Sequence, residues 1–211
     1  MISLYHVAPL ARLPSILNDG ALYSKSVLAA RRICGRPSAR RRDYALGLGD
    51  YVHLSPFLIT PLVRDKATKG YSHVVLEFNG ERIISQAGSA IVKYNTKSWF
   101  SKDTFRPERD LDTMRDLLRI CRSGARFQSM EVLAQVAVSL KSLVRIHCLA
   151  DEWVGEVQLL TSVFGYQKVS VECVTRGVFM NTDENSEKLR AYLQSCSETA
   201  SCLNVLDLPF D

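Results

Sequence analysis

The sequence contains no uninterrupted apolar run close to the roughly 20 residues that a membrane-spanning helix requires. Its first residues lack a basic segment followed by an apolar one, so we expect no secretion signal, a cytoplasmic location and no membrane partner. The six cysteines include no closely spaced pair, which favours reduced, mostly buried thiols and argues against a structural zinc site. We therefore expect no bound metal.

Familiar nucleotide-binding and catalytic motifs are also missing. The chain has no G-x-G-x-x-G after a strand, no P-loop pattern and no G-x-S-x-G. These absences argue against a Rossmann dinucleotide site, a P-loop NTPase and an α/β-hydrolase. A nucleotide would have to be held in some other way.

What remains has the composition of an ordinary globular protein. Of 211 residues, 46% are hydrophobic and 23% charged, which excludes collagen-like, low-complexity and wholly disordered chains. We find no internal repeat and no linker-like tract. The chain is interpreted as one main domain, residues 1–180, with a tail, residues 181–211, that packs on it or extends from it.

Charge is distributed unevenly along the chain. The net charge is +5, and residues 1–50 alone hold eight basic and three acidic side chains. Residues 181–211 hold two basic and six acidic ones. A basic head with an acidic tail favours a polyanionic ligand near the head, although a solvated charge run is an equal alternative.

Short apolar runs and helical periodicities predict many small elements. Strands are expected at 2–7, 50–54, 73–78, 81–85, 90–94, 130–138, 143–149 and 168–174. Helices are expected at 10–18, 27–33, 111–122, 153–164 and 184–193, with Gly20 ending the first. Strands mixed with helices at irregular intervals predict an α+β fold rather than a doubly wound sheet.

Four short motifs occur in an order that resembles the ADP-ribosyltransferase superfamily, and within it the DarT-type nucleic-acid ADP-ribosyltransferases. They are Tyr5-His6, Ile16-Leu17-Asn18-Asp19-Gly20, Asp50-Tyr51-Val52 and Glu131-Val132-Leu133. The order and spacing of the motifs follow those of the family from residue 2 to about residue 180, and residues 171–179 resemble the family's last strand. The sequence departs from the family pattern at residues 53–56. The resemblance implies a split β-sheet core with surrounding short helices, and residues 1–180 as the catalytic domain.

The resemblance also implies a reaction and the residues that carry it. The substrate would be NAD, whose ribose–nicotinamide bond breaks through an oxocarbenium-like transition state. Glu131 would be the catalytic carboxylate that stabilises this charge, and His6 would hydrogen-bond a ribose hydroxyl. The residues alone favour the simpler interpretation, in which Glu131 is a solvent-facing strand residue and His6 a satisfied core histidine.

Further NAD contacts follow from the same comparison. Gly49-Asp50-Tyr51 resembles a segment of poly-ADP-ribose polymerases, so Tyr51 could stack on nicotinamide, with Ser55 as the competing residue at that wall. The resemblance implies that one of Arg40, Arg41 and Arg42 lies near the NAD diphosphate. We choose Arg41 and count it among the catalytic residues. His53 has no role that the sequence supports.

The stretch 94–126 precedes the catalytic strand, where this superfamily carries its target-recognition loop. It interleaves aromatic and cationic residues, which suits an unpaired nucleic-acid strand. The nucleic-acid contacts predicted from it are Trp99, Lys102, Arg106, Arg122 and Arg126. Acidic residues are interspersed, so a solvated helix with internal ion pairs is the alternative.

The function predicted is an NAD-dependent mono-ADP-ribosyltransferase that modifies a nucleic-acid base, with single-stranded DNA favoured over RNA as the acceptor. The resemblance implies a toxin or defence effector with an antitoxin partner. Two alternatives remain open. One keeps the fold with another acceptor, as a protein-directed enzyme or a tRNA 2′-phosphotransferase-like one, which Val52-His53-Leu54-Ser55 suggests. The other is a catalytically dead binding module.

Overall fold

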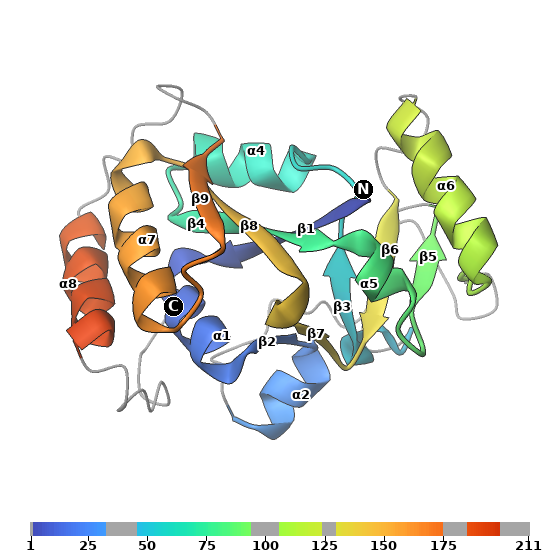
Figure 1. Cartoon of the computed structure of the whole chain (residues 1–211), viewed down its shortest axis with the longest axis horizontal. Coiled ribbons are helices and arrows are strands. Elements are labelled where there is room, and N and C mark those ends of the chain that lie inside the picture. Colours follow the sequence, from blue (N-terminus) through green and yellow to red (C-terminus); the bar gives the residue numbers. More distant parts are fainter. Residues whose placement is uncertain (1, 33–45, 94–105, 124–129, 175–184, 199–211) are drawn as a thin grey trace.

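The computed structural model describes residues 2–32, 46–93, 106–123, 130–174 and 185–198. Within these ranges the protein is a mixture of short strands and helices (Figure 1). The strands are β1 (Ser3–Pro9), β2 (Ala21–Tyr23), β3 (Tyr51–Leu54), β4 (His73–Asn79), β5 (Ala90–Val92), β6 (Glu131–Gln135), β7 (Ala137–Ser139), β8 (Leu143–Cys148) and β9 (Ser170–Cys173). The α-helices are α1 (Leu13–Asp19), α2 (Lys25–Ala30), α4 (Pro61–Thr68), α5 (Gly80–Ile84), α6 (Leu111–Ser123), α7 (Val154–Val163) and α8 (Asn185–Glu198). Short 3₁₀ turns are η1 (Leu10–Arg12), η2 (Leu48–Asp50), η6 (Leu140–Ser142) and η7 (Asp151–Trp153).

The described strands form three small sheets. A four-stranded sheet has the order β1-β4-β8-β9, antiparallel except for the parallel pair β8 and β9, which α7 connects. A three-stranded antiparallel sheet has the order β3-β6-β5, and β2 pairs with β7. Figure 1 shows the first two sheets side by side, with β3 close to β1. The expected α+β class is confirmed.

One bridge joins the two larger sheets. The backbone N–H of Tyr5 in β1 donates to the oxygen of Ser55, and the N–H of Ser55 donates to the oxygen of Tyr5, both over 2.8 Å. Because β1 is also an edge of the four-stranded sheet, it pairs with β4 on one side and meets the end of β3 on the other. The residues that follow Tyr5 therefore lie at the junction between the four-stranded and the three-stranded sheet.

The core lies on both faces of the four-stranded sheet. Successive side chains of β4 point to opposite faces of this sheet. Val74, Leu76 and Phe78 belong to the main core on one face, while Val75 packs with Val63 of α4 on the other. Helices α1 and α7 add Leu13, Leu17, Val157 and Leu160 to the main core. Figure 1 shows α4 over the opposite face.

Capping residues set the helix ends. Gly20 takes the left-handed conformation (φ 66°) that ends α1, as the sequence predicts. Ser24 accepts a hydrogen bond from the N–H of Val27 over 3.4 Å, so α2 begins earlier than the expected 27–33 and ends at Ala30. Strand β2 and helix α4 were not predicted, because neither has an extended apolar pattern of its own.

The strand expected at 81–85 is wrong, since these residues form α5. Asn79 caps this helix by accepting from the N–H of Arg82 over 3.3 Å. Gly80 lets the helix approach β1 closely, because a Cβ here would lie 2.6 Å from the side chain of Ile2. Ile83 and Ile84, which suggested a strand, are both buried beneath the helix.

The single strand expected at 130–138 is divided in two. Val136 stands between β6 and β7 in a left-handed conformation (φ 67°) and is 51% exposed. Its N–H donates to the oxygen of Asp50 and its oxygen accepts from Ser24, each over 2.8 Å. The bend therefore moves the chain from the β3-β6-β5 sheet to the pairing with β2.

The C-terminal helix α8 packs against α7. Leu193 and Cys196 are buried in the main core, and Arg190 forms an ion pair with Glu156 over 2.9 Å. Within the described ranges, no helix combines the length and apolar character needed to cross a membrane. Of the cysteines in those ranges, Cys121, Cys148 and Cys196 are buried, Cys173 is partly buried, and none of the four forms a disulfide.

Candidate active site

His6 lies on β1, one residue beyond the bridge between the sheets. Its Nδ1 atom is 2.8 Å from the backbone oxygen of His53 in β3. A carbonyl oxygen can only accept, so Nδ1 carries the proton in this contact. Burial lowers the pKa of His6 to about 4, against a weaker opposing effect of this hydrogen bond and with smaller lowering effects of His53 and Lys25. The ring is therefore neutral at neutral pH, and Nε2 is left as a hydrogen-bond acceptor.

Glu131 is the first residue of β6. Its Oε2 atom lies 3.2 Å from Nδ1 of His53, and its side chain is only 19% exposed. The pairing Leu54↔Val132 places Glu131 one step beyond the end of the β3–β6 ladder, and Val92 of β5 faces it on the other side. Its carboxylate thus lies at the end of an otherwise buried strand, beside His53 rather than in bulk solvent.

His53 connects the two predicted site residues, although the sequence assigned it no role. Its backbone oxygen contacts His6, its Nδ1 contacts Glu131, and its Nε2 is 3.3 Å from the oxygen of Leu48. The sequence carried one signal of this, a polar residue alternating with the buried Val52 and Leu54. Only the register of β3 on β6 reveals what that residue faces.

Tyr51 shares the His53 face of β3 but lies toward the other end of the ladder, opposite Gln135. Its ring packs against a small apolar cluster formed by Leu46, Leu48, Ala90, Val92 and Leu133. Its hydroxyl accepts from Nη2 of Arg109 over 3.1 Å, while Nη1 of Arg109 donates to the oxygen of Gly88 over 3.1 Å. Stacking of Tyr51 on nicotinamide stays a prediction.

Ser55, the competing residue, directly follows β3. It lies one step past Leu54 in the ladder, in line with Glu131, and its backbone forms the bridge to Tyr5. Its hydroxyl accepts from the N–H of Phe57 over 3.0 Å, which turns the chain away from the sheet. Ser55 is therefore closer in register to Glu131 than Tyr51 is.

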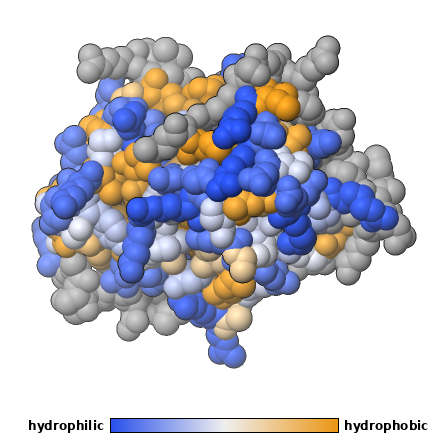
Figure 2. All heavy atoms as spheres, turned by 45° about the vertical axis from the view of Figure 1, so that its right-hand side comes forward, coloured by the Kyte–Doolittle hydropathy of each residue, from blue (hydrophilic) through white to orange (hydrophobic). Residues whose placement is uncertain are grey.

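Most of the predicted arginine and aromatic contacts lie outside the described residues. These are Arg40, Arg41, Arg42, Trp99, Lys102 and Arg126. Arg106 is described and exposed, two residues before the bridge between Glu108 and Ile91. Arg122 is in the last turn of α6. Figure 2 brings the α6 side forward and shows a hydrophilic band across the middle of this face, below a group of hydrophobic residues.

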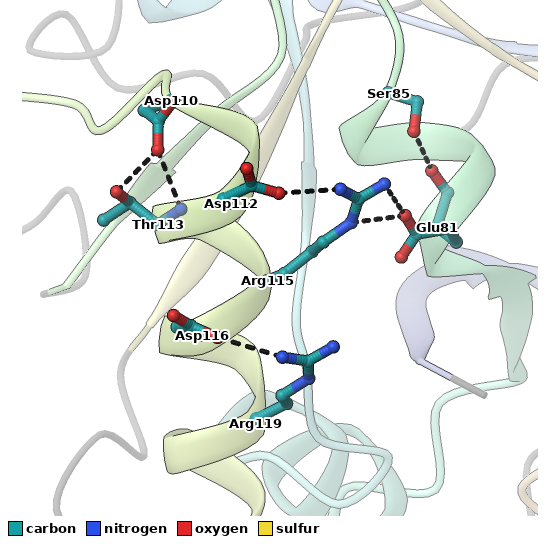
Figure 3. A network of polar contacts seen from close by, with 8 residues as sticks. All are labelled: Glu81, Ser85, Asp110, Asp112, Thr113, Arg115, Asp116 and Arg119. Atoms are coloured by element: carbon teal, nitrogen blue, oxygen red, sulfur yellow. Dashed lines mark hydrogen bonds and ion pairs between the residues drawn. The ribbon is translucent and has the colours of Figure 1, made fainter.

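Helix α6 carries several internal ion pairs (Figure 3). Arg115 contacts Asp112 over 2.9 Å and also contacts Glu81 of α5, and Arg119 contacts Asp116 over 3.0 Å. Asp110 caps the helix through two hydrogen bonds from Thr113, which hold the pKa of Asp110 below its usual value. The alternative of a solvated, ion-paired helix thus describes Arg115 and Arg119.

No three His, Cys, Asp or Glu side chains in the described part of the chain lie close enough together to hold a metal ion. The polar contacts at the sheet junction come instead from two imidazoles and one carboxylate. They offer a neutral acceptor at His6 and an acid at Glu131.

Neither a protein-family model nor a curated protein sequence matches the chain. Solved structures do match it. A structure described as Thermus sp. 2.9 DarT in complex with NAD+ superposes with a TM-score of 0.62 over 85% of this chain and 98% of that one, at 14% identity. This chain has the DarT fold.

Two other structures agree with the DarT fold. Thermus sp. 2.9 DarT in complex with ADP-ribosylated ssDNA gives a TM-score of 0.59 at 13% identity, covering 85% of this chain and 96% of that one. Thermosipho africanus DarTG in complex with ADP-ribose gives 0.60 at 14% identity, covering 82% of this chain and 50% of that one. The predicted resemblance to DarT-type ADP-ribosyltransferases is confirmed at the level of the fold. The residues of the site stay predictions.

Proposed function

We propose that this protein is an NAD-dependent mono-ADP-ribosyltransferase that modifies a base in nucleic acid, with single-stranded DNA as the preferred acceptor. One observation carries the proposal. His6 and Glu131, far apart in the sequence, both contact His53 where the two sheets of a DarT fold meet. The solved DarT complexes with NAD+ and with ADP-ribosylated ssDNA support the choice of substrate and acceptor.

The chemistry follows from the two side chains. Nε2 of neutral His6 accepts a hydrogen bond from a ribose hydroxyl of NAD, which orients the sugar without adding positive charge near it. The bond between ribose C1′ and nicotinamide breaks, and nicotinamide leaves with the bonding electron pair. The carboxylate of Glu131 stabilises the resulting oxocarbenium charge. A base nitrogen of the acceptor then bonds to C1′, and its proton goes to Glu131.

Other parts of the NAD site are assigned by the same proposal. Arg41, or its neighbours Arg40 and Arg42, neutralises the diphosphate with a forked guanidinium. Of the two residues considered for the nicotinamide wall, the register favours Ser55, which is in line with Glu131, while Tyr51 faces Gln135. NAD is consumed as a substrate here.

For the acceptor, we propose that Arg106 and Arg122, together with Trp99, Lys102 and Arg126, contact the unpaired strand. Arg115 and Arg119, which are not among the predicted contacts, form ion pairs with acidic side chains of α5 and α6. A toxin or defence role in the cytoplasm, with an antitoxin partner, completes the proposal and follows from the family alone.

Mass spectrometry of the acceptor tests the function directly. The protein is incubated with NAD and, in parallel, with single-stranded DNA, single-stranded RNA, 2′-phosphorylated RNA and a protein extract. We expect DNA to gain the mass of one ADP-ribose, and Glu131→Gln to abolish the gain. Glu152→Gln, an exposed glutamate at the start of η7, is the matched control and should leave it unchanged.

Three results would contradict this function. A mass gain on protein, or loss of the phosphate from 2′-phosphorylated RNA, in place of a gain on DNA would show that the acceptor is not DNA. Absence of nicotinamide release with every acceptor would reject the enzyme. Equal transfer by wild type and Glu131→Gln would reject Glu131 as the catalytic acid.

A further inference from the structure

His53 touches both candidate catalytic residues through different atoms. Its main-chain oxygen accepts from Nδ1 of His6 over 2.8 Å, and its ring Nδ1 lies 3.2 Å from Oε2 of Glu131. The ring and the carboxylate are similarly shielded, with 21% and 19% of their side chains exposed. A single residue of β3 therefore sets the separation between the acceptor on β1 and the acid on β6.

The ring of His53 is itself held from a second side. Its Nε2 is 3.3 Å from the oxygen of Leu48, in the 3₁₀ turn η2 that leads into β3. The partner of Nε2 is a carbonyl oxygen and the partner of Nδ1 is a carboxylate oxygen, and the tautomer with its proton on Nδ1 donates to Glu131. The ring is thus fixed between η2 and β6, and it presents an N–H to one oxygen of Glu131.

Fixing this carboxylate matters for the reaction. A glutamate side chain has three rotatable bonds, and ordering it costs conformational entropy each time it must reach its productive position. The contact at Oε2 holds one carboxylate oxygen and leaves Oε1 outside this hydrogen bond. Among the described contacts of Glu131, His53 is the side chain that supplies this restraint.

We propose that His53 is a positioning residue that holds Glu131 where it stabilises the charge developing as the NAD glycosidic bond breaks, while its backbone fixes the tautomer of His6. The proposal rests on the proposed function above. It assigns His53 no contact with NAD and no bond-making step. Its effect is on the orientation of Glu131, so it should appear in kcat more than in KM for NAD.

Two substitutions of His53 by residues with a side-chain amide distinguish this positioning role from a purely structural one. The side-chain nitrogen of Asn occupies roughly the place of Nδ1, and that of Gln the place of Nε2 of a histidine. His53→Asn therefore keeps a donor for Glu131, whereas His53→Gln keeps a donor for Leu48 only. Both variants retain the backbone oxygen that contacts His6.

The activity measurement compares nicotinamide release and transfer to DNA in wild type and in these variants at saturating NAD. We expect His53→Asn to stay within about tenfold of the wild-type kcat and His53→Gln to lose about 100-fold, with similar KM values for NAD. Equal activity of the Asn and Gln variants, whether high or low, would overturn the proposal, as would recovery by Gln alone.

A spectroscopic measurement keeps the test independent of turnover. The ring-nitrogen signals of His53, assigned by their loss in His53→Asn, are followed by ¹⁵N NMR in otherwise wild-type protein. We expect Glu131→Gln to shift them and Glu152→Gln to leave them in place. If Glu131→Gln has no effect on these signals, His53 does not hold Glu131, and the proposal fails. If the wild type releases no nicotinamide while the shift is seen, the proposed function fails and the contact stands.

Discussion

The imidazole of His6 donates from Nδ1 to the main-chain oxygen of His53 over 2.8 Å, and this contact decides which nitrogen of His6 remains for a ligand. Because burial lowers the pKa of His6 to about 4, the ring stays neutral and Nε2 has a free lone pair. A family comparison alone suggests a hydrogen bond to ribose. With Nδ1 donating to His53, only Nε2 of His6 is left for a ligand, and it can only accept, so the predicted hydrogen bond to ribose requires His6 as the acceptor.

His6→Asn is expected to weaken NAD binding while leaving the fold intact. The amide nitrogen of Asn replaces Nδ1 toward the oxygen of His53, but nothing replaces the acceptor at Nε2. The loss of one neutral hydrogen bond corresponds to about 1 kcal/mol, or about fivefold in Kd. Isothermal titration with NAD measures this. An unchanged Kd would show that Nε2 does not contact NAD.

The stability of the protein is expected to fall as pH decreases from neutral toward 4. Burial lowers the pKa of both His6 and His73 to about 4 from the usual 6.5, so the unfolded chain binds more protons than the folded one in this range. Stability is therefore fully present above about pH 6.5 and is lost as pH falls through that window. Urea unfolding at a series of pH values measures the slope.

The control for this pH dependence is His73→Phe, which keeps an aromatic ring beside Tyr71 and removes the titrating nitrogens. It should reduce the slope between pH 6.5 and 4 without affecting NAD turnover. A slope equal to that of the wild type would mean that His73 takes up its proton in the folded state as readily as in the unfolded one.

Val136→Gly is expected to stabilise the protein. A β-branched residue at φ 67° is strained, and Val136 is 51% exposed, so its removal costs little buried surface. Relief of about 1–2 kcal/mol is partly offset by the greater freedom of glycine in the unfolded chain, giving a net gain of up to about 1 kcal/mol. Thermal unfolding compares it with Val136→Ala, which keeps the strained Cβ and should gain less. A lower melting temperature for the glycine variant would count against strain at this bend.

Arg106→Ala is expected to weaken binding of single-stranded DNA and to reduce its salt dependence. Loss of one phosphate contact lowers the slope of log K against log salt by about 0.7. Arg119→Ala is the matched control, because Arg119 is an exposed arginine of α6 outside the predicted set of nucleic-acid contacts. Fluorescence anisotropy with a labelled oligonucleotide at several salt concentrations measures both. Equal slopes for the two variants would remove Arg106 from the nucleic-acid interface.

Local patterns predicted the elements that carry their own signals. The strand starting near residue 2, the helix ended by Gly20, the strand at 73–78 and the amphipathic helix at 111–122 all occur close to the expected positions. The wrong strand prediction at 81–85 has a local cause. Asn79 caps a helix there, and the two isoleucines of that helix had suggested a strand. The division of the expected strand 130–138 at Val136 has no signal in the local sequence, because valine rarely adopts a left-handed conformation.

The sequence by itself determined the periodicities, caps and apolar runs from which the α+β class follows, and its ordered motifs pointed to His6 and Glu131. Only the tertiary structure decided that β1 meets β3 at Tyr5 and Ser55, that β3 pairs with β6 in the register placing His53 beside Glu131, and that Tyr51 faces Gln135. The reason is that strand register depends on hydrogen bonds between segments far apart in the chain, and a shift of one residue would turn His53 to the opposite face.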